Sequence, residues 1–349
     1  MRRSRVLAVL GAVVGAAGVL AVAWAVMLGG GRPSTQEPRA TATPAASLHL
    51  TAAGDYSSSD AAAGVLEQIA ALGPDLHLAL GDLSYGETGE ETEWCDFVKS
   101  KVGDRIPFEL VSGNHEADGE KGDIEAFASC LPNRLPGLVG VYARQYYVDV
   151  PQDHPLARII LISPGFPFSD GVWSYAKGSA RYDWTAAAID GARSAGIPWT
   201  IVGMHTVCIS VGEKPCEAGT DLTNLLVSKR VDLVLNAHEH FYQRTKQLGI
   251  TPNCPRLVPE KFNADCVTGT GTTESKGAGT VFATAGTGGQ TLRQADLADG
   301  DAPYFAAHAD LDTNPSHGLV DVRLTPQELK YSFVPTDSTY SDSLTISAG

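Results

Sequence analysis

Five short apolar runs, each ending in a polar residue that can bind a metal, constrain the fold of this chain most strongly. They are "LHLTAAGD", "DLHLALGD", "PFELVSGNHE", "PWTIVGMH" and "VDLVLNAHEH", at residues 48–55, 75–82, 107–116, 198–205 and 231–240. Stretches with the apolar spacing or composition of helices lie between them, at residues 59–72, 182–196 and 221–229. Strands that alternate with helices favour a mainly parallel sheet, and ligands bind beyond the carboxyl ends of such strands.

Later apolar runs lack long helices between them. They lie at residues 141–150, 158–163, 279–289, 317–325 and 329–334. This change of pattern favours a second, more antiparallel sheet. We therefore predict two sheets packed face to face, with helices on the outside.

The composition limits the class of protein. With 349 residues, of which 43% are hydrophobic, the chain can bury the core of one large α/β domain. The formal net charge of -14 would repel a nucleic-acid backbone, so we expect no nucleic-acid partner.

The N-terminus poses a separate problem. Residues 6–28 carry no charge, follow Arg2, Arg3 and Arg5, and are long enough for a helix that crosses a bilayer. We favour an uncleaved signal anchor at residues 1–28, with a cleaved signal peptide as the alternative because "AVAWA" offers small-residue cleavage sites. A Pro-, Gly-, Ser- and Thr-rich linker at residues 29–46 and a folded domain at residues 47–349 would then lie outside the cytoplasm, anchored or secreted.

The six cysteines agree with an oxidising compartment. Six cysteines permit fifteen pairings, and none here has the C-x-x-C spacing of a zinc cluster or redox dithiol. The simplest prediction pairs neighbours: Cys95 with Cys130, Cys208 with Cys216, and Cys254 with Cys266.

The polar residues at the five strand ends are the candidate functional residues. Each has an ordinary explanation when taken alone: an Asp after Gly favours a turn, and a single His is usually a satisfied structural imidazole. Their joint occurrence at successive strand ends favours a metal site instead, and residues i and i+2 of an extended chain point to the same side. The candidates are Asp55, Asp82, Tyr85, Asn114, His115, Glu116, His205, His238 and His240.

In order along the chain, these blocks resemble the motifs of the calcineurin-like metallophosphoesterases, and specifically the purple acid phosphatase branch. The blocks are "GD" at 54–55, "GDLSYG" at 81–86, "GNHE" at 113–116, "GMH" at 203–205 and "AHEH" at 237–240. That branch lacks the His of an Asp-x-His first block and supplies a metal-binding Tyr, which matches Tyr85. The chain departs from the usual pattern at Ser57 and Ala237, where the family usually has Gly.

The resemblance implies the metallophosphoesterase fold, a four-layer α/β/β/α sandwich of two mixed sheets flanked by helices. It also implies two metal ions, Fe(III) with Fe(II), Zn or Mn, with Asp82 bridging them. One ion would be bound by Asp55, Asp82, Tyr85 and His240, and the other by Asp82, Asn114, His205 and His238. His115 would contact the phosphate and act as general acid, supported by Glu116. "TAGTGG" at 284–289 resembles a glycine-rich turn near the family's site, although an ordinary turn explains these glycines equally well.

The function implied by the resemblance is hydrolysis of phosphate monoesters by a metal-bound hydroxide in an exported protein. A phosphodiesterase acting on nucleotides or phospholipid headgroups is the alternative within enzymes, because the same pair of metals serves both reactions. A catalytically silent surface binding protein and a purely structural domain are the alternatives outside them. The sequence leaves the physiological substrate and the oligomeric state open.

Overall fold

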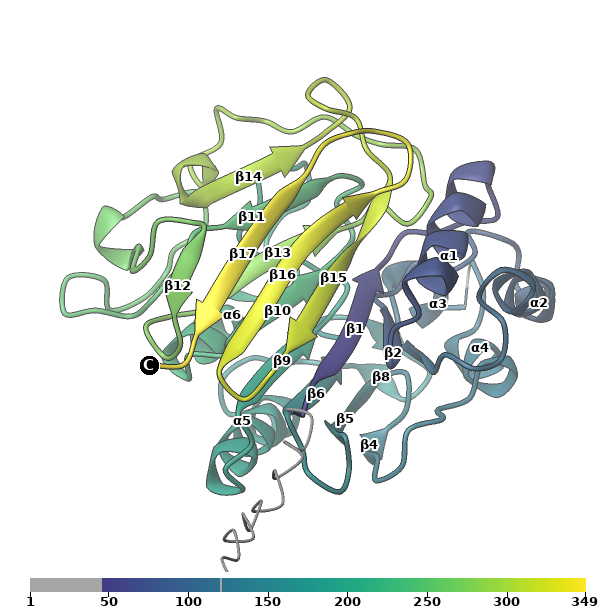
Figure 1. The fold of residues 1–349 in the computed structure, drawn as a ribbon, viewed down its shortest axis with the longest axis horizontal. Coiled ribbons are helices and arrows are strands. Elements are labelled where there is room, and N and C mark those ends of the chain that lie inside the picture. Colours follow the sequence, from purple (N-terminus) through teal and green to yellow (C-terminus); the bar gives the residue numbers. More distant parts are fainter. Residues whose placement is uncertain (1–45, 120) are drawn as a thin grey trace, which may run out of the picture. The chain divides into compact units, whose positions relative to one another are not determined.

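Two β-sheets pack face to face in the computed structural model, which describes residues 46–119 and 121–349. In Figure 1 the yellow and purple strands of one sheet lie in front of the teal and green strands of the other. The first sheet has seven strands in the order β12-β17-β16-β15-β1-β2-β3, and the second has eight in the order β14-β11-β13-β10-β9-β6-β5-β4. Each sheet contains parallel and antiparallel pairs, so the predicted sandwich of two mixed sheets is confirmed.

The strands and helices have the following bounds. The seven-stranded sheet contains β1 (Leu48–Ala53), β2 (Leu76–Ala79), β3 (Phe108–Leu110), β12 (Thr273–Ser275), β15 (Gly318–Leu324), β16 (Glu328–Pro335) and β17 (Asp342–Ser347). The eight-stranded sheet contains β4 (Val139–Val141), β5 (Gln145–Val150), β6 (Ala157–Ile162), β9 (Trp199–Gly203), β10 (Leu233–Asn236), β11 (Tyr242–Thr245), β13 (Val281–Ala285) and β14 (Phe305–Ala309). A small hairpin pairs β7 (Pro167–Phe168) with β8 (Gly171–Val172), and the helices are α1 (Asp60–Leu72), α2 (Glu91–Val102), α3 (Asn114–Ala117), α4 (Ile124–Cys130), α5 (Ala180–Ser194) and α6 (Thr220–Ser228).

Alternate side chains of the central strands supply two different cores. In β6, Ile159 and Leu161 belong to the core between the sheets, while Ile160 and Ile162 belong to the core that includes the helices. Successive side chains of a strand point to opposite faces, so an uninterrupted apolar run is the pattern of a strand buried on both sides. This explains why the runs that end at the site are continuously apolar.

Helix α1 shows how the sequence sets the outer layer. The Ser59 side chain accepts a hydrogen bond from the Ala62 N–H at its start, and Gly73 ends it in the left-handed region at φ 59°. Its buried face includes Val65, Leu66 and Ile69, which recur at helical spacing. The predicted helix at residues 59–72 is therefore confirmed.

The division of strands between the sheets differs from the prediction. Strands β1, β2 and β3 are parallel neighbours in the seven-stranded sheet, but β9 and β10 are parallel neighbours in the eight-stranded one. Between them, the antiparallel ladder β4-β5-β6 starts the second sheet, and α5 then connects β6 to its parallel neighbour β9. The five runs thus come from two sheets.

Three disulfides join the cysteines as predicted, Cys95 with Cys130, Cys208 with Cys216, and Cys254 with Cys266. The predicted membrane segment at residues 6–28 and the boundary at residue 28 lie outside the described residues. Within residues 46–119 and 121–349, no helix combines the length and apolar character needed to cross a bilayer.

Candidate metal centre

The candidate residues lie just beyond the carboxyl ends of five strands, in loops or at the start of a short helix. Asp55 follows β1, Asp82 and Tyr85 follow β2, and Asn114 begins α3 just after β3. From the other sheet, His205 follows β9 and the pair His238 and His240 follows β10. The first three strands belong to the seven-stranded sheet and the last two to the eight-stranded sheet, so both sheets contribute to the site.

Several of these loops adopt backbone conformations that are unusual for residues other than Gly. Asp55, Asp82, Tyr85 and His238 have φ values of 59°, 49°, 56° and 72°. Non-Gly residues in the left-handed region are uncommon, and they cluster at functional sites where the surrounding structure holds them. Ser57 also has a positive φ of 73°, which is a physical reason for the Gly that the family usually has at this position.

Glycines allow the loops to pack against one another. A Cβ atom at Gly113 would overlap the Asp82 carboxylate, and one at Gly286 would overlap the Glu239 carbonyl and crowd Asp55. The "GNHE" and "TAGTGG" blocks therefore require Gly at these positions because the neighbouring loop lies too close for a side chain. Ala237, which replaces the family's usual Gly, is accommodated in part because its neighbour across the site, Gly54, has no side chain.

One half of the cluster collects anionic and phenolic oxygens around an imidazole. The Tyr85 hydroxyl lies 2.8 Å from Asp55 Oδ1, 3.1 Å from Asp82 Oδ2 and 3.0 Å from His240 Nε2. His240 Nε2 is also 3.3 Å from Asp55 Oδ1. These four side chains converge, as the sequence predicts for the first metal ion.

The second half collects nitrogen donors around the other oxygen of the same carboxylate. His205 Nε2 lies 3.4 Å from Asp82 Oδ1 and 2.9 Å from His238 Nδ1. Ligand atoms of Asp82, His205 and His238 lie within 4.8 Å of one another. Asn114 Oδ1 is buried without a hydrogen-bond partner, which is costly unless something else binds it.

The arrangement of Asp82 links the two halves. Its Oδ2 atom faces Tyr85 and its Oδ1 atom faces His205, so a single carboxylate presents one oxygen to each half. Carboxylate, phenolate, amide and imidazole groups suit hard and borderline cations. The donor set therefore fits two adjacent metal ions.

The outward nitrogens of two of these imidazoles are held by backbone carbonyls. His205 Nδ1 lies 2.8 Å from the Leu80 carbonyl oxygen, and His240 Nδ1 lies 3.0 Å from that of Thr291. Such contacts fix the orientation and tautomer of a metal-binding His, which leaves the other nitrogen to face the metal. Sequence reasoning missed these partners because a backbone carbonyl carries no residue signal.

The electrostatics of the cluster favour a positive charge at its centre. Burial alone would raise the pKa of the Asp55 carboxyl, but His205, His240 and His238 outweigh burial and hold that pKa well below its usual range. Burial would lower the pKa of the His205 imidazole, yet Asp82 and Asp55 raise it to about 10. In the absence of metal ions, protonated His205 compensates the two carboxylates, which is the charge that a bound cation would supply.

His115 and Glu116 have different surroundings. The His115 side chain is 30% exposed, compared with 0% for His205, and its Nε2 lies 3.5 Å from Asp82 Oδ2. The Glu116 carboxylate is buried and accepts hydrogen bonds from the backbone N–H groups of Asp82 at 2.9 Å and Gly113 at 2.7 Å. Burial and the charge of Asp82 raise the pKa of Glu116 to about 8. These contacts hold the Asp82 and Gly113 loops together, and a role for Glu116 in supporting His115 stays a prediction.

Comparison with known proteins agrees with this geometry. A family model described as calcineurin-like phosphoesterase matches residues 48–242, which is more than half of the chain. The chain is 28% identical over 214 residues to purple acid phosphatase 21 of Arabidopsis thaliana, covering 58% of this chain and 46% of the plant protein. It is 26% identical over 216 residues to purple acid phosphatase 18 of the same plant, covering 59% and 47%. The chain thus spans about half the length of the curated relatives it matches.

Solved structures support the fold. A purple acid phosphatase, PPD1, from seeds of yellow lupin (Lupinus luteus) has a TM-score of 0.64 at 17% identity, covering 87% of this chain and 54% of that one. A structure described as GAP50, the anchor in the inner membrane complex of Plasmodium, has a TM-score of 0.57 at 15% identity, covering 86% and 89%. At these identities the similarity shows the fold alone.

Proposed function

Because this chain belongs to the calcineurin-like phosphoesterase family, we propose that it is a dinuclear metal-dependent phosphatase that hydrolyses phosphate monoesters. The observation that supports this most is the position of Asp82, whose two oxygens face two separate groups of donors. Two adjacent cations, when bound, lower the pKa of a shared water molecule and stabilise the charge that develops on the phosphoryl group. No nucleophilic Ser or Cys is required for this reaction.

We assign the ligands in two groups that share Asp82. The first group is Asp55, Asp82, Tyr85 and His240, and the second is Asp82, Asn114, His205 and His238. Since phenolate is an anionic oxygen donor suited to ferric iron, the first group would take Fe(III) and the second Fe(II), Zn or Mn. Metal analysis and the visible spectrum test the iron assignment: a violet absorption that disappears in Tyr85→Phe would support it, and two colourless metals would remove it.

His115 would protonate the leaving oxygen. It is the most exposed imidazole of the cluster, so it can contact a bound ester, and its backbone N–H donates to Asp82 Oδ1 at 3.1 Å. The Tyr85 ring lies against the His115 ring with centroids 4.5 Å apart, which restricts the imidazole. A general acid in this position contributes about 100- to 10,000-fold to the rate. We expect His115→Ala to lower kcat for a poor leaving group far more than for a good one such as nitrophenolate.

The preference for monoesters is tested by a direct comparison of substrates. The purified domain, loaded with two metals, is assayed with nitrophenyl phosphate and with bis(nitrophenyl) phosphate under the same conditions. We expect a higher kcat/KM for the monoester. A much higher value for the diester would replace the proposal with the phosphodiesterase alternative.

We also propose that the protein acts outside the cytoplasm. Three disulfides form in the described residues, as is usual in oxidising compartments. The uncharged segment at residues 6–28 would export the domain and anchor it in the membrane by an N-terminal helix, or would be cleaved to release it. Fractionation of cells into membrane, soluble and secreted material, with N-terminal sequencing of the protein, distinguishes these outcomes.

A catalytically silent surface protein remains the second candidate, because GAP50, described as an anchor, has a similar fold. The complete set of predicted ligands argues against it. If the protein is catalytically silent, the domain with two bound metals hydrolyses neither substrate, although Asp82→Asn still lowers its metal content.

A further inference from the structure

The third metal-facing imidazole, His238, has a different kind of outward contact. Its Nδ1 atom points into the cluster, 2.9 Å from His205 Nε2. Its Nε2 atom lies 3.0 Å from Oε2 of Glu217, whereas the outward nitrogens of His205 and His240 face backbone carbonyls. The outward contact of His238 is therefore the one that depends on a side chain, and a substitution can remove it.

We propose that Glu217 is a positioning residue that orients His238 for metal binding, and that the Cys208–Cys216 disulfide holds Glu217 in place. The proposal rests on the metal site proposed above. His238 Nε2 is buried without a hydrogen bond in the described residues, and the Glu217 carboxylate at 3.0 Å is placed to accept one after a small reorientation. When Nε2–H donates to that carboxylate, the lone pair of Nδ1 faces the second metal ion. A carboxylate in this position also increases the basicity of the imidazole, and loss of such a partner lowers metal affinity about 10- to 100-fold.

A disulfide and a backbone hydrogen bond constrain the chain on either side of Glu217. The disulfide closes residues 208–216, so Glu217 is the first residue beyond the crosslink. Directly outside it, the Ala218 N–H donates to the Val207 carbonyl at 3.1 Å. The Glu217 side chain is 38% exposed, so packing alone does not hold it against His238. The disulfide and the flanking hydrogen bond limit where the carboxylate can lie.

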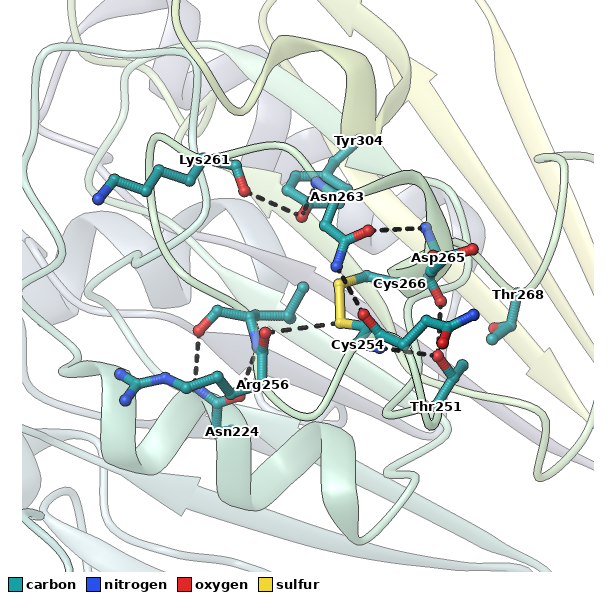
Figure 2. Close-up of a disulfide and its surroundings, with 12 residues drawn as sticks. Asn224, Thr251, Cys254, Arg256, Lys261, Asn263, Asp265, Cys266, Thr268 and Tyr304 are labelled. Carbon is teal, nitrogen blue, oxygen red and sulfur yellow. Dashed lines mark hydrogen bonds between the residues drawn. A yellow bond between two sulfur atoms is a disulfide. The ribbon is translucent and has the colours of Figure 1, made fainter.

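A second disulfide of similar loop length provides a matched control. Cys254 and Cys266 are twelve residues apart, compared with eight for Cys208 and Cys216. Figure 2 shows Cys254–Cys266 among polar residues such as Thr251 and Asn263, and none of the predicted metal ligands is labelled there. Removing this disulfide should lower stability without a specific effect on the metal site.

The side-chain test measures zinc affinity of the full chain by competition with a fluorescent chelator. We expect Glu217→Ala to weaken binding of the second Zn²⁺ about 10- to 100-fold. Glu217→Gln keeps an acceptor oxygen, so it should restore most of this loss. Glu213→Ala is the control on the same loop, because Glu213 pairs with Arg293 at 2.9 Å, and its zinc affinity should match that of the wild type.

The disulfide test uses the same measurement and does not depend on activity. We expect Cys208→Ser/Cys216→Ser to weaken the second Zn²⁺, Cys254→Ser/Cys266→Ser to leave its affinity unchanged, and Glu217→Ala to add little to the first double variant. Should that double variant fail to fold, as judged by circular dichroism, the Glu217 series still decides the role of the carboxylate. Two bound Zn²⁺ in the wild type with equal affinity in Glu217→Ala would overturn this inference alone. A wild-type domain that binds fewer than two would overturn the metal site on which it rests.

Discussion

Two buried polar clusters of this molecule satisfy their groups in opposite ways. In the candidate metal centre, called the metal centre below, donors and acceptors converge on a common point, and Asn114 Oδ1 is left without a partner. In the second cluster, which we call the inter-sheet cluster, Arg244 of β11 forms two hydrogen bonds to Asp342 of β17, at 2.6 and 2.8 Å. Tyr242 donates to the same carboxylate at 2.6 Å, and Tyr331 donates to Tyr242 at 3.0 Å.

The difference indicates which cluster needs a ligand. The inter-sheet cluster contains its own cation, and Arg244 offers a fixed fork of donors that matches a carboxylate. It is closed and joins the eight-stranded sheet to the seven-stranded one. The metal centre has carboxylates close together and no Lys or Arg among its converging side chains, so its charge is balanced only by protonated imidazole or by bound metal ions. Burial and polarity alone therefore do not identify a functional site, whereas unmatched donor groups that converge do.

Asp82→Asn should break the metal centre with the largest effect. An amide cannot supply a bridging carboxylate, so we expect loss of most of the second metal and a fall in kcat of at least about 100-fold, or about 2.7 kcal/mol in the activation barrier. The metal-free variant should be less stable than the metal-free wild type, because the substitution removes a buried carboxylate that pairs with protonated His205. Metal analysis, phosphatase assay and urea unfolding of the apoprotein check the three parts. Unchanged metal content would contradict the ligand assignment.

Chelation tests whether bound metal ions stabilise the protein through the metal centre. Ligand binding to the folded state stabilises it by about 2.7 kcal/mol per site at a free concentration 100 times Kd, or roughly 5 kcal/mol for two sites. We expect chelator to lower the Tm of the wild type by roughly 10 to 20 °C, since about 1 kcal/mol shifts the Tm of a large domain by about 2–4 °C. Asp82→Asn should show a much smaller shift. Calorimetry measures the Tm of both proteins with and without chelator. Equal shifts in Tm would mean that the stabilising metal binds elsewhere.

Asp342→Ala should break the inter-sheet cluster without touching the metals. Arg244 is 2% exposed, and removal of its partner leaves a buried charge unpaired, which costs about 3–5 kcal/mol. We expect this loss in urea unfolding, with unchanged metal content per folded molecule. Arg323→Ala is the control, since that side chain is 56% exposed and its charge stays solvated beside Asp321. A loss of metal in Asp342→Ala would show that the two clusters are coupled.

The sequence predicted the convergence of the candidate metal ligands far better than the inter-sheet cluster, for a physical reason. The candidate ligands follow apolar runs at strand ends, and a sheet brings such ends together whatever the details of strand order. Arg244 and Asp342 are 98 residues apart and have no local pattern, so their pairing follows only from the packing of the two sheets. The same limit explains the incorrect division of strands, because β1 pairs with β15, whose residues lie about 270 positions later.

The neighbouring cysteine pairs were predictable because closing short loops costs little entropy. The contact between Glu217 and His238 had no signal in the sequence, since Glu217 lies outside every motif block. The left-handed backbone of Ser57 is also a result of the structure, although the family's usual Gly at this position pointed to it. The candidate ligands could therefore be predicted from local sequence motifs, whereas the side chains that orient them depend on long-range packing.

A third buried carboxylate, Glu109 of β3, is only partly paired, which places it between the metal centre and the inter-sheet cluster. Its substitution should have the smallest effect of those considered. Its Oε1 accepts a hydrogen bond from the Arg134 N–H at 3.0 Å, but its Oε2 is buried without a hydrogen-bond partner. Burial outweighs the backbone hydrogen bonds and raises the pKa of Glu109 from 4.5 to about 7. The folded protein therefore holds this proton over a pH range in which the unfolded chain has released it.

The sign of the pH dependence follows from this difference. The contribution of Glu109 to stability is fully present below pH 4.5, falls as the pH rises, and is lost above about pH 7. The total change between these pH limits is about 3.4 kcal/mol, at 1.36 kcal/mol per pKa unit. Glu109→Gln does not titrate, so urea unfolding at pH 5 and pH 8 should show a smaller fall in stability for the variant than for the wild type. Equal falls would mean that Glu109 is ionised in the folded protein, and that a partner, such as a water molecule, satisfies Oε2. The group would then resemble the closed inter-sheet cluster.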